Sequence, residues 1–69
     1  MDAQVMIHKV NSIAQFFSAY PREEAVAGIA DHLQRFWEPR MRRQLLEHLQ
    51  QSGGELNELV IEAAQRLHG

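Results

Sequence analysis

The residues that most often carry out chemistry in proteins are scattered along this 69-residue chain and form no catalytic motif. The four histidines fall one in each expected helix, and none has a partner four residues away, the spacing of a metal site on one helix. They are His8, His32, His48 and His68. The serines lie in no nucleophile motif, and Gly53-Gly54 indicates a turn rather than a phosphate-binding loop. We therefore expect no catalytic, cofactor-binding or metal-binding residue on this chain.

The chain also contains no cysteine. This excludes disulfides and cysteine-based zinc sites, which are common supports of small domains, and iron–sulfur clusters held by thiolates. A domain of this size buries only about 60% of the surface that its unfolded chain exposes. Its stability must then come from very regular helix packing or from another protein chain.

The most distinctive chemistry lies in segment 35–43, which reads RFWEPRMRR. It holds four of the seven basic residues and one acidic residue, a local charge of +3 in a chain of net charge -2. Tryptophan and arginine are enriched at binding hot spots, and arginine can pair with a carboxylate through two parallel hydrogen bonds. We expect the main partner contact from Arg35, Phe36, Trp37, Arg40, Arg42 and Arg43. An equally supported role for Trp37 is that of a core residue fixing the angle between two helices.

Helical periodicity positions these residues, and no alternating run of strand length competes with it. Apolar residues of the first segment recur at steps of four and three, at Met6, Val10, Ile13, Phe17 and Tyr20. Capping and helix-breaking residues predict four helices. The first lies between Asp2 and Pro21, the second between Pro21 and Pro39, and the third between Pro39 and Ser52-Gly53-Gly54. The fourth begins after Asn57. The sequence thus predicts an all-α fold, a small compact bundle of about four short helices, as one domain over 1–69.

The first expected helix is apolar over roughly half of its circumference, more than one seam against a small bundle needs. Val5 and Phe16 form the surplus flank. One interpretation is that the other helices cover this flank. The other is that the flank docks on another protein, because a large apolar patch is unusual on a monomer.

The composition, with 45% hydrophobic and 23% charged residues, is that of a globular protein. No apolar run approaches the roughly 20 residues of a membrane span, and the start of the chain lacks the basic residues of a secretory signal. We expect a cytoplasmic protein without membrane contact. Nucleic acid is a weak candidate partner, since the chain is net acidic with one small basic cluster.

Segment 25–42, AVAGIADHLQRFWEPRMR, resembles the signature of the delta subunit of NAD-dependent formate dehydrogenase. This family supplies the small accessory chain of the soluble, molybdenum-containing bacterial enzyme. The similarity covers nearly the whole chain, and 32–42 is its most specific part. Matching features outside the signature are Asn11, Ile13 and Phe16-Phe17 near the start, and Gly53-Gly54, Leu56 and Leu59-Val60 near the end.

The resemblance implies a non-catalytic subunit that binds the large catalytic subunit and stabilises the complex or assists its maturation. It implies that the complex oxidises formate to carbon dioxide with NAD. The molybdenum cofactor, the iron–sulfur clusters, FMN and NAD are then expected on partner subunits. Two alternatives stay open, a small nucleic-acid-binding module and a self-associating regulatory module. The isolated chain could likewise form a homo-oligomer.

Overall fold

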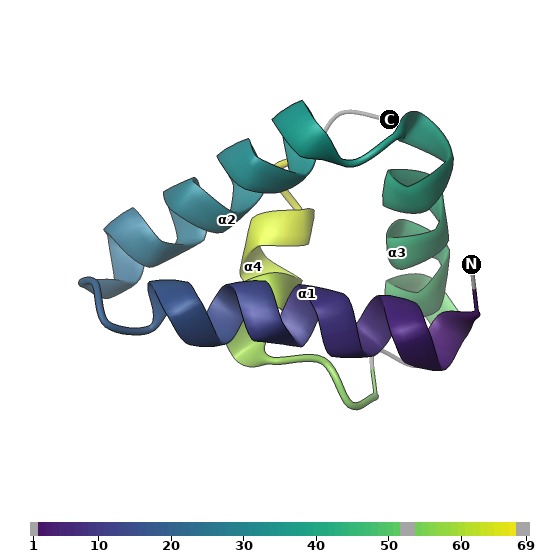
Figure 1. Cartoon of the computed structure of the whole chain (residues 1–69), viewed down its shortest axis with the longest axis horizontal. Coiled ribbons are helices and arrows are strands. Elements are labelled where there is room, and N and C mark those ends of the chain that lie inside the picture. The colour runs from purple at the N-terminus through teal and green to yellow at the C-terminus, as the bar shows by residue number, and fades with distance from the viewer. Residues whose placement is uncertain (1, 52–53, 68–69) are drawn as a thin grey trace.

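A computed structural model describes residues 2–51 and 54–67, which form four α-helices (Figure 1). These are α1 (Ala3–Phe17), α2 (Arg22–Phe36), α3 (Pro39–Gln51) and α4 (Glu58–Ala64). No strand occurs in the described part of the chain. The predicted all-α fold of four short helices is confirmed.

The helix boundaries follow from local chemistry that the sequence already shows. The Asp2 carboxylate accepts a hydrogen bond from the Gln4 amide at 3.3 Å and so caps α1. The Asn57 side chain accepts one from the Leu59 amide at 2.8 Å and caps α4 in the same way. Pro39 is the first residue of α3, where its missing N–H removes no helical hydrogen bond. The expected stop at 52–54 lies partly outside the described residues, because 52 and 53 are not among them.

The end of α1 differs from the prediction. The apolar stripe was expected to continue to Tyr20, but α1 ends at Phe17 and the Tyr20 side chain is 49% exposed. The expectation that Tyr20 continues the helix is wrong, because a residue before proline is disfavoured in the α region. Pro21 instead occupies the N-cap position of α2.

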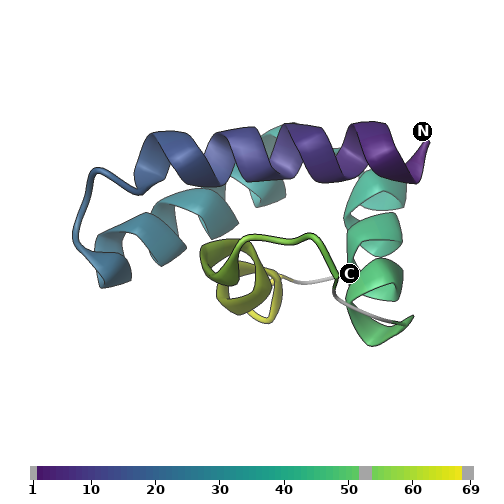
Figure 2. The same ribbon diagram turned by 90° about the horizontal axis from the view of Figure 1, so that it is seen from below.

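The helices enclose a triangle rather than running parallel to one another (Figure 1). α1 and α2 diverge from their connecting turn, and α3 crosses the wide end. α4 lies on one side of this frame, as the turned view shows (Figure 2). It packs most extensively on α2, while α1 contacts each of the other three helices.

The core fills the centre of the triangle and takes residues from every helix. Its fully buried large side chains are Met6, Val10, Val26, Ile29, Leu33, Leu45 and Val60. The radius of gyration is 10.7 Å, close to the value of about 11 Å for a folded domain of this length. The described residues of the four helices therefore pack around one shared core.

Candidate partner-binding surface

Two of the predicted contact residues close the joint between α2 and α3 from the inside. The Trp37 and Arg42 side chains are 7% and 8% exposed. Nη1 of Arg42 donates to the carbonyl oxygen of Gln34 at 3.3 Å and also to that of Trp37. Carbonyls at a helix C-terminus have no donor within the helix, so Arg42 supplies one for the end of α2. Trp37 takes the core role, and Arg42 supports the joint rather than facing outward.

The other predicted residues of the segment face outward, and we call them the joint surface: Arg35, Phe36, Arg40 and Arg43. Phe36 is 72% exposed. Nε of Arg35 lies 3.0 Å from Oδ1 of Asp31, one helical turn earlier, so its charge is locally neutralised. Arg40 and Arg43 border a shallow depression on α3 with Gln44 and Glu47. Within the described residues, neither of these two arginines forms an ion pair.

The basic segment therefore presents two free cations instead of the four that the sequence suggested. A protein that binds nucleic acid through phosphate contacts needs several clustered cations, because each contact adds to affinity by releasing counterions. The arrangement of segment 35–43 weakens the nucleic-acid alternative and leaves a mixed aromatic and basic surface.

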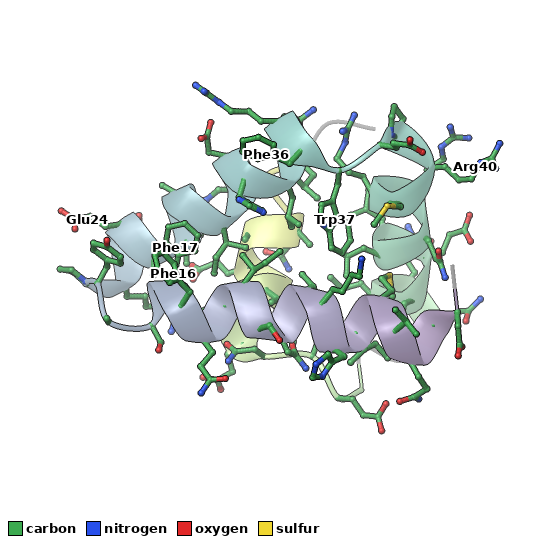
Figure 3. The ribbon with its side chains drawn as sticks, in the orientation of Figure 1. Phe16, Phe17, Glu24, Phe36, Trp37 and Arg40 are labelled. Atoms are coloured by element: carbon green, nitrogen blue, oxygen red, sulfur yellow. The ribbon has the colours of Figure 1, made fainter. Side chains whose placement is uncertain are left out.

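A second surface lies between α1 and α2, and we call it the aromatic groove. It is a hollow of about 330 Å³ lined by Ser12, Ile13, Phe16, Phe17 and His32. The Phe16 and Phe17 rings meet edge to face with centroids 5.2 Å apart, a favourable aromatic arrangement. The Phe36 ring lies 5.0 Å from the imidazole of His32 and continues the α2 side of this surface. Figure 3 shows Phe16 and Phe17 on α1, Phe36 on α2 and Trp37 inside the triangle.

Gly28 on α2 makes room for the Phe17 ring. A Cβ atom at position 28 would lie 2.5 Å from Cε1 and 2.8 Å from Cδ1 of Phe17. Real carbon atoms do not approach so closely, so the missing side chain lets the ring lie against α2. Gly28 thereby helps position an aromatic lining residue of the groove.

Sequence reasoning placed Phe16 on a docking flank but missed Phe17, Gly28 and His32 as parts of one surface. The signal was present in the spacing of Gly28, His32 and Phe36, which recur every four residues on one face of α2. The four-residue spacing does not say which face of α1 lies opposite, so the groove itself needed the tertiary structure.

The Val5–Phe16 flank is uncovered. Val5 is 45% exposed and Phe16 67% exposed, and both lie on one face of α1. The other helices do not cover these side chains, which excludes the interpretation that the fold buries them. Phe16 lines the aromatic groove, whereas Val5 does not.

Among the described residues, no three histidine, aspartate or glutamate side chains gather closely enough to hold a metal ion. The sequence has no cysteine, so its residues do not fit an iron–sulfur cluster held by thiolates. In the described part of the chain, no helix has the length and apolar character needed to cross a membrane.

Comparison with protein families shows what kind of chain carries these surfaces. The sequence model of the NADH-dependent formate dehydrogenase delta subunit family, FdsD, matches residues 6–64. The chain belongs to the formate dehydrogenase delta subunit family. The matched region contains α2, α3 and α4, the joint surface and the aromatic groove. No curated protein and no solved structure matches the chain.

Membership of this family makes the chain a subunit of an oxidoreductase complex, with partner subunits around it. The two surfaces described above are therefore the places to look for subunit contacts. Exposed aromatic and arginine side chains are the usual anchors of such contacts.

Proposed function

We propose that this chain is a non-catalytic subunit that binds the large catalytic subunit of a cytoplasmic formate dehydrogenase. In this role it stabilises the complex or assists its maturation. The family match over residues 6–64 carries the proposal. Oxidation of formate to carbon dioxide with NAD then takes place on partner subunits, which hold the molybdenum cofactor, the iron–sulfur clusters and FMN.

The joint surface supports this proposal as the main contact. Phe36 is 72% exposed, a large apolar side chain that contact with another protein would bury. Arg40 and Arg43 lie beyond it on α3, exposed and without ion-pair partners in the described residues. An acidic and apolar patch on the large subunit would complement this surface. Trp37 and Arg42 contribute by holding α2 and α3 at the angle that presents it, and Val5 with Phe16 forms a second contact.

Reversing the charge of the joint surface tests this contact. We expect Arg40→Glu with Arg43→Glu to reduce recovery of the chain with a tagged large subunit from cells. The matched control is Arg22→Glu with Arg66→Glu, which changes the charge equally at another part of the molecule. The Arg66–Glu23 pair is exposed and the Arg22–Glu62 pair is partly exposed, so both contribute little to the stability of the fold. Equal recovery of both variants and the unmodified chain would show that the joint surface is not the contact.

Deleting the chain separates the two roles within the complex. A maturation role predicts that the purified large subunit contains less molybdenum when the chain is missing. A clamping role predicts normal molybdenum content and subunits that dissociate on dilution. Metal analysis and analytical gel filtration of the same preparation measure both outcomes. Normal metal content together with unchanged subunit association would contradict both roles.

A further inference from the structure

We infer that the aromatic groove seats an amphipathic helix of the large catalytic subunit. This helix inserts an apolar side chain beside Phe16 and His32 and sets an acidic side chain against Lys9. The inference rests on the proposed function and adds to it the binding surface and the chemistry of the bound segment.

The lining of the groove calls for an apolar occupant. Large exposed apolar side chains gather around it, because Phe16 lines it and the Tyr20 ring lies 6.5 Å from the Phe16 ring. Phe36 extends the opposite side through its contact with His32. The hollow of about 330 Å³ accommodates a bulky aliphatic or aromatic side chain. Apolar pockets that a partner's side chain fills are the usual centres of protein–protein contacts.

The shape of the surface favours a helix as the occupant. Its two sides are helices, with Phe16 and Phe17 from α1 and His32 from α2. α1 and α2 diverge from their connecting turn (Figure 1), and side chains of both helices line the hollow. A third helix packs into a groove between two helices with apolar side chains at every third or fourth position.

Two exposed charges lie on the helix faces that carry the groove residues, and they would set the polarity of the bound helix. Lys9 lies on the face of α1 that carries Ser12 and Phe16, three and seven residues before them. Glu24 lies four residues before Gly28 on α2, near the turn that joins the helices (Figure 3). Neither charge forms an ion pair among the described residues. A bound helix is therefore favoured with its N-terminus toward Glu24 and its C-terminus, or an acidic side chain, toward Lys9.

The charges also argue against α1 of a second copy as the occupant. Ala3–Phe17 contains no acidic residue. An α1 helix seated in the groove of another copy would bring its own Lys9 and no carboxylate. A segment of a different protein can supply the missing negative charge.

Photo-crosslinking in the assembled complex identifies the occupant. We place p-benzoylphenylalanine at position 16 in the groove and, as control, at position 27, an exposed position about half a turn around α2 from His32. We expect position 16 to crosslink to one amphipathic helical segment of the large subunit, and position 27 not to crosslink to it. Crosslinks from position 16 only to another copy of this chain would overturn the inference. So would a complex that forms normally without a crosslink to the large subunit.

Binding measurements with substituted chains test the two chemical features. The full-length chain is titrated into a large subunit purified without it. We expect Phe16→Asp to weaken binding by about tenfold or more, as for truncation of a central anchor. Lys9→Glu should weaken it about two- to fivefold, as for a charge at the rim, and more so at low salt. Ala27→Asp and Gln15→Glu are the controls and should leave affinity unchanged.

The same titration separates failure of this inference from failure of the proposed function. If the unmodified chain does not bind the large subunit, the proposed function fails. If it binds and Phe16→Asp binds equally well, the function stands and the groove is not the site. Phe16 is 67% exposed, so its substitution leaves the core intact. Circular dichroism of each variant checks this, and Phe16→Ser serves as a second, milder variant.

Discussion

At the scale of single residues, Arg42 is the side chain whose role sequence pattern suggests least. It lies 8% exposed on a helix that also carries the exposed Arg40 and Arg43. Its Nη1 donates to two main-chain carbonyls at the end of α2, while its Nε has no hydrogen-bond partner. A hydrogen bond from a charged donor contributes about 1.5–3 kcal/mol, so these two bonds stabilise the joint between α2 and α3.

We predict that Arg42→Leu lowers the free energy of unfolding by about 2–3 kcal/mol, since it removes two hydrogen bonds made by a charged donor. Arg42→Lys keeps a donor of the same charge and should cost less. Urea unfolding measures both, with the exposed Arg43→Leu as control, expected within about 0.5 kcal/mol of the unmodified chain. Equal losses for the Leu and Lys variants would show that the hydrogen bonds are not the cause.

A second prediction at the residue scale concerns Gly28, because the effect of adding a side chain there depends on one neighbour, the Phe17 ring. Gly28→Ala should lower the free energy of unfolding by about 1 kcal/mol, since overpacking against the Phe17 ring outweighs the better helix propensity of alanine. The new Cβ would otherwise lie 2.5 Å from Cε1 of that ring. In a chain that already carries Phe17→Ala, the ring is gone and Gly28→Ala should instead raise the free energy of unfolding by up to about 1 kcal/mol. A double-mutant cycle without this change of sign would contradict the packing account.

At the scale of elements, α4 depends on the segment that leads into it. α4 spans only seven residues (Glu58–Ala64), too short to be stable alone. The Asn11 side chain on α1 donates to the Glu55 carbonyl at 2.6 Å and accepts from the Asn57 amide at 2.9 Å. Glu55 has a φ of 69°, an unfavourable value for a residue with a side chain, and Asn11 helps hold it there.

We predict that Asn11→Leu loosens α4 before the rest of the fold. The free energy of unfolding should fall by about 1–2 kcal/mol, the value of the lost hydrogen bonds. Hydrogen exchange should speed up most at the amides of α4. The Asn11→Asp variant keeps the acceptor for the Asn57 amide. Its free energy of unfolding should therefore lie between those of Asn11→Leu and the unmodified chain. Ser12→Ala is the control, because the Ser12 hydroxyl bonds only within α1. Uniform acceleration in all four helices would contradict a local role for Asn11.

At the scale of the whole molecule, the four helices share one core, and the sequence contains no cysteine to crosslink it. The core is small, and the ion pairs among the described residues are largely exposed and add little stability. Most of the stability must then come from the helix packing around Trp37, Leu33 and Leu45.

We predict that the isolated chain is folded but marginal, with a free energy of unfolding of about 3–5 kcal/mol. Trp37, the only tryptophan, is 7% exposed and should emit at short wavelength in the folded state and shift red on unfolding. Guanidinium titration followed by this emission gives the free energy. A red-shifted emission before denaturant is added would show that the core forms only in the complex.

Much of the fold was predictable because its signals are local. The caps at Asp2 and Asn57 and the helix start at Pro39 depend on residues within one turn of each boundary. The candidate site was predictable only in part. Phe36 and Phe16 are exposed, as a contact requires, whereas Trp37 and Arg42 are buried. The binding role of all these residues stays a prediction.

The sequence by itself determined the helices, the family and the lack of thiolate ligands, because these follow from residue types and short spacings. Only the tertiary structure decided which arginines are free and which aromatic side chains share a surface. Periodicity gives the direction of a side chain around its own helix, but not the neighbour that lies there. Arg42 turns inward because α3 meets the end of α2, and Phe17 reaches Gly28 because α1 and α2 pack together.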